Sequence, residues 1–554
     1  MLLPDKYNYG CLFALSGIDA VNEHKNDFCG MLMPAPVTVR FDAEIPVTLS
    51  IPAPDDTAFD YVLSDMIKGR GIELVFVDCN SVAGTSEYEA SVTAEGIIPV
   101  TKDNACIIAA NDFYYALLKD GRKFSLARAK DEESALKKAR EAIIADTDGI
   151  TEKRLDYYRK MPPCPKPEYE KLYYKCLEVN RVNVYSPQDG IDCRFTTPDR
   201  LPHRHMWLWD SMFHAMAISR YDTQLAKEAI WAVLQCQKDD GFIPHMMKSR
   251  DDVSSITQPQ VIAWAVLTVY NRDSDIEFLR KCAPKISRYL DWFIRNRDEN
   301  GNCLLEWDMN FDSGNCRCDE SGMDNSPRFD VSEKVDAVDC NAFMVNDCNC
   351  LAEIYRILGD EDNFVKYKAT ADDFSYDINQ QLWDDENGIY CDRTMSGNLT
   401  GILTCASFLP MFAGLCPMKR AKRMVEMLED PEKFDTAFPV PSIARDHELY
   451  GADMWRGCVW INFNYFIIKG LRFYGYGRQA DKIADITLKT VNRWFEETGN
   501  IFEFYDAEDK IAPWHLNRKG RQPETPDYRI KMHAITDYNW TASFLQLIMA
   551  EKEK

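Results

Sequence analysis

The chain has 554 residues and carries 88 Asp and Glu against 65 Lys and Arg, a formal net charge of −23. Because binding to a polyanion depends on basic side chains that neutralise phosphates, this balance argues against nucleic acid or an anionic membrane as a partner. The hydrophobic share of 46% is that of a globular chain, and the length suffices for two to four domains or for one large domain with an appendage.

The N-terminus and the cysteines bear on location and metal content. Residues 1–7 show no basic region followed by an apolar segment, and no run of eighteen apolar residues occurs, so neither a secretory signal nor a transmembrane helix is predicted. The nineteen cysteines lack disulfide-framework spacing and are expected to be free thiols in a cytoplasmic protein. Cys-x-Cys pairs at 316–318 and 348–350 would form a metal site only if the fold brought them together, and no further Cys or His pair supports that. No metal and no cofactor are predicted.

Residues 1–130 have the pattern of a β-rich domain. Short runs rich in β-branched residues are separated by turn clusters such as 52–56 and 119–121. This spacing predicts an N-terminal antiparallel β-sandwich-like domain. The expected strands lie at 36–40, 45–51, 72–77, 88–94 and 105–110.

A change in composition follows at residue 131. Residues 132–145 are rich in Ala, Lys and Glu and are expected to be helical, and 162–167 form a stiff proline-rich segment. Residues 131–167 are therefore predicted to be a helical and Pro-rich linker between two domains.

Beyond residue 167 the periodicity is helical, and Asp, Asn or Pro stands at several helix starts as a cap. Twelve helices in hairpin pairs are the number that an (α/α)6 toroid of six helical hairpins requires, so the fold is predicted to be mainly α with a toroid over 168–554. Apolar segments such as 261–270 and 458–471 are expected inside and the amphipathic 418–428 outside. The expected starts lie near Glu168, Asp210, Asp222, Gln258, Asp275, Asp339, Glu361, Ile402, Pro417, Arg456, Arg478 and Asp537.

A short internal repeat supports this arrangement. Trp383 and Trp494 are each followed five residues later by a glycine, then by a short apolar run and an acid, Asp392 in the first copy and Glu503 in the second. A glycine at this place is typical of a helix C-terminus. The repeat predicts that loops at one end of the toroid bring side chains to a common place.

The acidic loop 319–330 holds four carboxylates and an arginine beside Gly322 and Pro327, which prevent a regular helix. Surface loops are often acidic, so a polar connector between helices is the simpler interpretation. The alternative is an active-site loop that presents Asp324 to a substrate. Its distant partner is then Glu503, which lies between two phenylalanines that would desolvate it partly and suit it to proton transfer.

Clusters of tryptophan with polar residues favour the second interpretation. They occur at the expected helix starts 207–210, 455–462 and 539–541. Tryptophan faces pack on the C–H surfaces of sugars, while Asp, Arg and Asn form paired hydrogen bonds with hydroxyl groups. Core packing remains the commoner role of a single tryptophan.

Five ordered motifs resemble glycoside hydrolase family 63, which shares its clan with the family 37 trehalases. They are residues 207–215 with Gln235, residues 240–245, the acid loop 320–328, residues 455–462 and residues 502–506. The resemblance covers about residues 200–545. Cys458 stands where a proline is usual, Phe329 where a tryptophan is common, and an inserted segment at 308–319 precedes the acid loop.

The resemblance implies hydrolysis of an α-glycoside with inversion, with Asp324 as general acid and Glu503 as general base. The substrate implied is a short α-glucoside, or an α-mannoside such as mannosylglycerate, attacked by an exo-acting enzyme without a cofactor. The predicted substrate-binding residues are Trp207, Trp209, Asp210, Phe213, His245, Gln258, Arg328, Trp455, Arg456, Trp460, Asn462 and Trp540.

Two other functions stay open at this point. One is a sugar phosphorylase on the same toroid, although the presence of Glu503 argues against it because a phosphorylase needs no base to activate water. The other is a catalytically inactive carbohydrate-binding protein. In all three cases the partner is a small oligosaccharide or glycoside.

Overall fold

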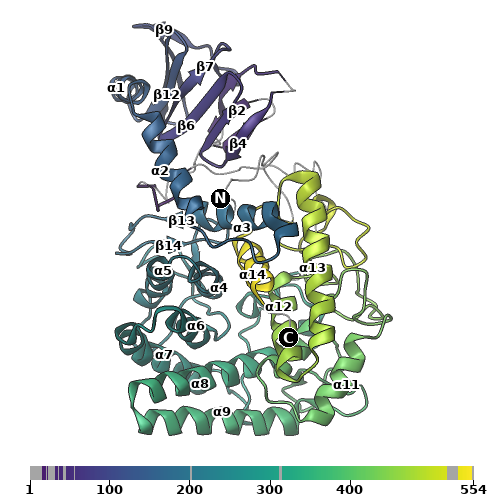
Figure 1. Cartoon of the computed structure of the whole chain (residues 1–554). Helices are drawn as coiled ribbons and strands as arrows, with labels where there is room; N and C mark the ends of the chain where they lie inside the picture. Colours follow the sequence, from purple (N-terminus) through teal and green to yellow (C-terminus); the bar gives the residue numbers. More distant parts are fainter. Residues whose placement is uncertain are drawn as a thin grey trace.

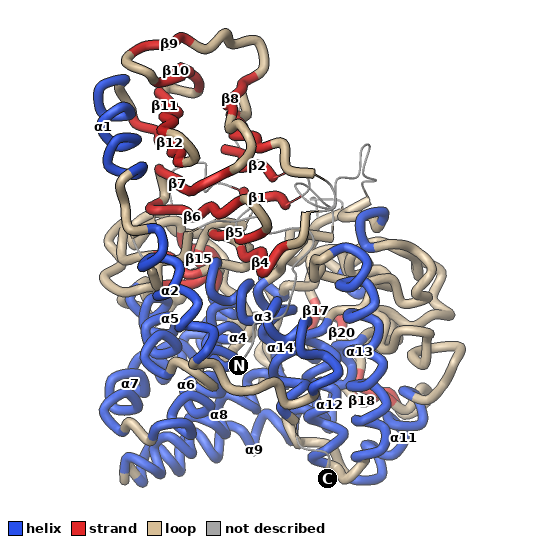
Figure 2. Tube along the Cα trace, turned by 45° about the horizontal axis from the view of Figure 1, so that its top comes forward, coloured by secondary structure: helices blue, strands red, loops and turns tan. Residues whose placement is uncertain are grey.

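The structure is a computed structural model that describes residues 15–19, 21–22, 31–34, 37–41, 45–54, 57–199, 203–310, 315–520 and 534–551. Strands gather at one end of the molecule and helices at the other (Figures 1 and 2). The prediction of a largely helical chain with a β-rich N-terminal region is thus confirmed. Within the described residues, no helix combines the length and the hydropathy needed to cross a membrane.

The N-terminal region contains two antiparallel sheets, and the ring of Phe41 on one sheet contacts Phe76 and Tyr115 on the other. Hairpins of the larger sheet turn through pairs of residues with positive φ, such as Asn111 and Asp112, as tight β-turns require. The smaller sheet has the order β1 (Met31–Pro34), β2 (Val37–Phe41), β3 (Val47–Ile51) and β8 (Ser91–Ala94). The larger has the order β4 (Phe59–Leu63), β5 (Met66–Gly69), β6 (Ile72–Asp78), β7 (Ser81–Ser86), β12 (Lys123–Ala129), β11 (Phe113–Asp120), β10 (Ala105–Ala110) and β9 (Val100–Lys102).

Helix α1 (Glu132–Ile143) is part of this β-rich packing. Its residues Ala135, Leu136 and Ala139 share a small core with strands β10, β11 and β12. Helix α2 (Thr147–Arg159) contacts β6 and continues toward the helical region (Figure 1). The first part of the segment expected as a linker therefore packs on the larger sheet, because its alanine face is apolar enough to be buried.

The twelve helical segments expected after residue 167 correspond to helices α3–α14. Six of them, α4, α6, α8, α10, α12 and α14, each contact the next, and α14 contacts α4 again. Helix α3 packs against α14, α5 against α4, α7 against α6, α9 against α8, and α13 against α12. The bounds are α3 (Glu170–Val182), α4 (Leu208–Ile218), α5 (Thr223–Gln235), α6 (Ile262–Asp273), α7 (Ile276–Asn296), α8 (Val338–Leu358), α9 (Glu361–Gln381), α10 (Leu409–Phe412), α11 (Met418–Leu428), α12 (Ile461–Phe473), α13 (Gly477–Thr498) and α14 (Asn539–Ala550).

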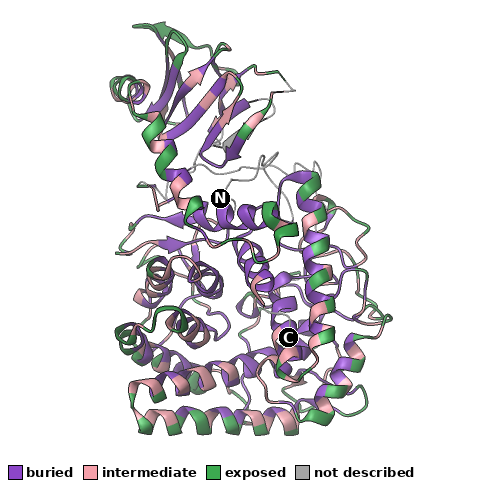
Figure 3. Ribbon diagram, viewed as in Figure 1, coloured by how far each residue is buried: buried purple, intermediate pink, exposed green. Residues whose placement is uncertain are grey.

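Burial differs among these helices. Helices α4, α12 and α14 are buried almost throughout, whereas α9 and α11 keep an exposed polar face (Figure 3). The helix starts differ as well: Asp222, Asp275 and Asp360 cap α5, α7 and α9 with side-chain hydrogen bonds. The cap residues of α4, α6, α8, α12 and α14 make no such bond. Some of their first backbone N–H groups bond to distant side chains instead: Trp209 in α4 donates to Gln258, Ala263 in α6 to Asp347, and Val338 in α8 to Asp392.

Short two-stranded ribbons complete the fold in the loops between helices. They pair β13 (Val184–Tyr185) with β14 (Phe195–Thr196), β15 (Met206–Trp207) with β16 (Met246–Met247), β17 (Val335–Asp336) with β20 (Arg393–Thr394), and β18 (Trp383–Asp384) with β19 (Ile389–Tyr390).

Candidate active site

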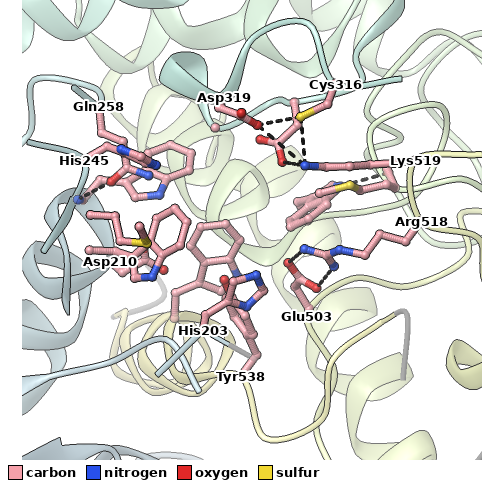
Figure 4. A pocket seen from close by; sticks show the side chains of 18 of the residues that line it. His203, Asp210, His245, Gln258, Cys316, Asp319, Glu503, Arg518, Lys519 and Tyr538 are labelled. Atoms are coloured by element: carbon pink, nitrogen blue, oxygen red, sulfur yellow. Dashed lines mark hydrogen bonds and ion pairs between the residues drawn. The ribbon is translucent and has the colours of Figure 1, made fainter. Parts of the chain in front are cut away.

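A cavity of about 990 Å³ lies where the starts of helices α4, α12 and α14 meet. Each of these helices carries tryptophan at its start, so the wall at this end of the helical region is aromatic. Asp210, His245 and Gln258 lie on one side of the cavity, and Cys316, Asp319 and Lys519 on the other (Figure 4). The lining residues are His203, Trp207, Trp209, Asp210, His245, Met246, Gln258, Asn315, Cys316, Asp319, Gly322, Asp324, Met454, Trp460, Glu503, Arg518, Lys519, Gly520, Tyr538 and Trp540.

The acid loop is fixed from two sides. A short 3₁₀ turn at Asp319–Ser321 ends at Gly322, whose φ of 73° is the left-handed conformation that glycine adopts readily. The buried carboxylate of Glu320 accepts hydrogen bonds from the Arg297 guanidinium group and from the backbone N–H of Asp308 at 2.7 Å. Asp330 at the far end of the loop forms an ion pair with Arg456 at 2.6 Å. The loop therefore presents Asp324 from a rigid frame.

Asp324 lines the cavity with 18% of its side chain exposed. Its carboxylate accepts a hydrogen bond from the ammonium group of Lys519 at 2.8 Å. Burial raises the pKa of Asp324 above its ordinary value, the ammonium group of Lys519 opposes that rise, and the carboxylate of Asp319 adds to it. The raised pKa is the property that a proton donor needs near neutral pH.

Glu503 has a different environment, since only 2% of its side chain is exposed. Both of its carboxylate oxygens pair with the guanidinium group of Arg518, one of them at 3.1 Å (Figure 4). The backbone between Phe502 and Tyr505 is held by β-bridges to residues 459 and 536, which bring the start of α12 and the segment before α14 to the same place. A two-point contact with arginine fixes the plane of this carboxylate.

Asp210 and His245 are the other two titratable side chains that the sequence analysis assigned to this cavity. Burial raises the pKa of Asp210 well above its ordinary range, and one of its oxygens is buried without a hydrogen-bond partner among the described residues. Burial lowers the pKa of His245 to about 4, so this ring is neutral at pH 7. Its Nδ1 lies 2.5 Å from the hydroxyl of Ser254, and Gln258 accepts from the backbone N–H of Trp209 at 3.1 Å. These groups form a polar wall with hydrogen-bonding capacity left for a ligand.

The structure brings most of the predicted site residues together. Besides the two carboxylates, Trp207, Trp209, Asp210, His245, Gln258, Trp460 and Trp540 line the cavity.

Five predicted substrate-binding residues do not line it, and packing explains each. Phe213 packs against Trp209, Phe466, Trp540 and Phe544, because it faces inward one turn into α4. Trp455 stacks on Trp460 with ring centres 3.8 Å apart, and Arg456 holds the acid loop through Asp330. Asn462 is fully buried, and neither of its amide atoms has a partner among the described residues. Arg328 is also fully buried, where it pairs with Asp339 and Asp392.

Several lining residues were not expected from the sequence. Arg518 and Lys519 lie in a polar stretch with no motif, and their positions relative to the two acids depend on chain segments far apart in the sequence. Cys316 was considered for a metal site, yet its thiol donates to Asp319 at 2.6 Å and accepts from Lys519 at 2.9 Å. His203 and Tyr538 also line the cavity, where their rings meet edge to face.

Comparison with known proteins agrees with this site. The model of the mannosylglycerate hydrolase MGH1-like glycoside hydrolase domain matches residues 203–541. Fold and site together are those of a glycoside hydrolase, and the matched region contains both carboxylates and the aromatic wall. The chain belongs to this MGH1-like family.

Three known proteins illustrate the similarity. Mannosylglycerate hydrolase of Rubrobacter radiotolerans is 25% identical over 451 residues, which cover 64% of this chain and 93% of that protein. Mannosyl-oligosaccharide glucosidase of Saccharomyces cerevisiae is 24% identical over 390 residues, 54% of this chain and 46% of that protein. The crystal structure of family 63 mannosylglycerate hydrolase from Thermus thermophilus in complex with Tris superposes with a TM-score of 0.55 at 23% identity, over 69% of this chain and all of the other, and therefore shares the fold.

Proposed function

We propose that this protein is an inverting, exo-acting α-glycosidase in which Asp324 is the general acid and Glu503 the general base. The observation that carries the proposal is the convergence of these two carboxylates in one tryptophan-lined cavity. They have unlike surroundings, since burial raises the pKa of Asp324 while Glu503 is held by a guanidinium group. Unlike environments for two acids are the usual basis for dividing acid and base roles.

The reaction needs no cofactor. Asp324 protonates the glycosidic oxygen as the bond to the leaving group breaks, while Glu503 takes a proton from a water molecule that attacks the anomeric carbon from the opposite face. The tryptophan faces exclude water around the sugar and pack on its C–H surfaces. One oxygen of the buried Asp210 has no hydrogen-bond partner among the described residues, which suits it to accept a hydrogen bond from a sugar hydroxyl or, when protonated, to donate one.

The proposed substrate is a short α-mannoside or α-glucoside with a small acidic leaving group, such as mannosylglycerate. The names of the relatives support this class, and so does a cavity that holds the two cations Arg518 and Lys519 in a chain of net charge −23. We further propose that residues 168–554 form an (α/α)6 toroid that carries the site, with residues 1–130 as a separate β-sandwich-like domain and the segment 131–167 between them. The ring of contacts among α4, α6, α8, α10, α12 and α14 supports this division.

Phosphorolysis and sugar binding without turnover are the competing functions. A phosphorylase needs an anion site in place of a base, whereas Glu503 occupies the site as a carboxylate. Product analysis with and without inorganic phosphate separates the two reactions.

The test is hydrolysis of a panel of α-linked mannosides and glucosides, with the anomer of the fresh product read by NMR. We expect hydrolysis with a β-anomer as first product. Asp324→Asn and Glu503→Gln should each lower turnover by about 10²–10⁴-fold and leave binding of the sugar nearly intact. Asp239→Asn, on an exposed turn, is the matched control. Near wild-type turnover in either cavity variant would refute the assignment.

A further inference from the structure

Lys519 lies at the centre of three acceptors. Its Nζ is 2.8 Å from Asp324, 2.9 Å from the sulfur of Cys316 and 3.6 Å from Asp319. An ammonium group in contact with a carboxylate favours the ionised form of that carboxylate. In this arrangement Lys519 therefore opposes the protonation of Asp324 that a general acid needs before it can donate a proton.

The two ion pairs of the cavity differ in how easily they exchange partners. Arg518 contacts Glu503 at two points, and Glu503 is almost fully buried. Lys519 contacts Asp324 through a single nitrogen, and 31% of its side chain is exposed. A compact ammonium group on a flexible stem exchanges its acceptors more readily than a planar guanidinium group with two parallel hydrogen bonds. The Lys519 contact is the labile one.

The backbone that carries Lys519 is tied down on both sides. The backbone N–H of Asn517 donates to Ala452 at 2.9 Å, and that of Gly520 donates to Asp453 at 2.8 Å. A side chain at Gly520 would lie 2.5 Å from Asn315, so the chain also packs closely there. A change of partner for the ammonium group thus requires movement of the Lys519 side chain alone.

The charges around Asp324 determine what this movement does. When the ammonium group leaves, burial and Asp319 still favour the protonated acid. Arg518 opposes this, but it stays bound to Glu503. The titratable groups that face Asp324 are Lys519, Asp319, Arg518, Cys316 and His245.

We propose that Lys519 is the specificity-determining residue of this site: its ammonium group opposes protonation of Asp324 until the anionic leaving group of the substrate takes that ammonium group over, and Asp324 then takes up a proton from solvent more readily and serves as the acid. A neutral leaving group offers the ammonium group no comparable partner and leaves it in contact with Asp324. Lys519 in this way couples recognition of the carboxylate on the leaving group to protonation of Asp324. This inference rests on the proposed function.

The experiment compares two substrates that carry the same sugar, the one hydrolysed fastest in the panel. One has glycerate as leaving group and the other glycerol, in which a CH₂OH group replaces the carboxylate. Wild type, Lys519→Met, Lys519→Arg and the surface control Lys510→Met, whose ammonium group pairs with Glu508, are measured for kcat, KM and the pH dependence of kcat.

We expect wild type to prefer the glycerate substrate. We also expect the basic limb of its pH profile, the fall in kcat as the pH rises, to lie at higher pH with the glycerate substrate than with the glycerol substrate. Lys519→Met should lower the preference at least about tenfold, the equivalent of one charged contact. It should also move the basic limb with the glycerol substrate to higher pH, because Asp324 loses the cation that favours its ionised form. Lys519→Arg should keep part of the preference, and Lys510→Met should match wild type.

The outcomes separate the two proposals. If wild type hydrolyses neither substrate nor any glycoside of the panel, the proposed function is wrong. If wild type hydrolyses both, but Lys519→Met keeps the substrate preference and the position of the basic limb, the role of Lys519 is wrong while the hydrolase stands. Should Lys519→Met be unstable, Lys519→Gln, which also removes the positive charge, provides the same comparison.

Discussion

Both oxygens of the Glu503 carboxylate pair with the guanidinium group of Arg518, fifteen residues further along the chain. The next residue, Lys519, pairs with the other proposed catalytic carboxylate, Asp324. Two consecutive cations thus contact two acids that come from distant loops. The cavity therefore holds its acids by charge as well as by packing.

Replacement of Arg518 tests whether the orientation of Glu503 matters for turnover. We expect Arg518→Gln to lower kcat by about 10–10²-fold with a smaller change in KM, because the carboxylate loses the two-point contact that fixes its plane. Arg518→Lys keeps the positive charge but offers only one contact, so its kcat should lie between those of wild type and Arg518→Gln. Steady-state kinetics on the best substrate measure this, and an unchanged kcat in Arg518→Gln would exclude an orienting role.

Replacement of Gly322 tests how closely the acid loop packs against the aromatic wall. Its φ is 73°, and a Cβ atom there would lie 2.3 Å from the ring of Trp209. Gly322→Ala should therefore shift either the loop or the ring and lower kcat/KM, beyond the cost of about 1 kcal/mol for a left-handed alanine. The matched control is Gly359→Ala, which has a φ of 76° and open space around the Cβ position. Equal loss of activity in both variants would mean that backbone strain alone is responsible.

Replacement of Arg328 tests whether this residue, predicted from the sequence to bind substrate, instead stabilises the fold. It is fully buried between Asp339 and Asp392, so Arg328→Met should lower the free energy of unfolding by about 3–5 kcal/mol, because two carboxylates remain buried without their cation. Adding Asp392→Asn should restore part of the loss. Urea unfolding measures both, with Arg356→Met on the surface, whose guanidinium group pairs with the exposed Glu353, as a control that should remain close to wild type. Undiminished stability in Arg328→Met would contradict a structural role.

The buried carboxyl group of Asp347 should make the free energy of unfolding depend on pH. Its carboxylate accepts hydrogen bonds from the backbone N–H groups of Ala263 and Trp264 at the start of α6, and burial raises its pKa to about 7. Between the ordinary pKa of an aspartate, about 4, and pH 7 the folded state holds more protons than the unfolded state. The contribution of Asp347 to the free energy of unfolding is thus fully present below about pH 4 and is lost as the pH rises toward 7.

Asp347→Asn is the corresponding test, since asparagine keeps an acceptor for α6 but does not titrate. The unfolding free energy, measured in urea from pH 4 to 7, should fall less steeply with pH than in wild type. Asp239→Asn on the surface is the control. An unaltered slope would show that Asp347 does not titrate in this window.

The sequence by itself determined the parts of this protein that depend on local patterns. Helical periodicity and capping residues located the twelve segments that became α3–α14, and turn clusters located several strands of the sheets. Ordered motifs of tryptophan and acid picked out Asp324 and Glu503, both of which line one cavity. These features are readable because periodicity, caps and motifs act over a few residues.

Only the tertiary structure decided which side chains meet. Phe213 and Asn462 have the same motif character as Trp209 and Trp460, yet they turn into the core, because position around a helix decides whether a residue faces a cavity or its neighbours. Lys519 has no motif at all, and its contact with Asp324 exists because the backbone around it is tied to residues 452–453. Contacts between segments nearly two hundred residues apart depend on packing and charge across the whole fold, which no local pattern records.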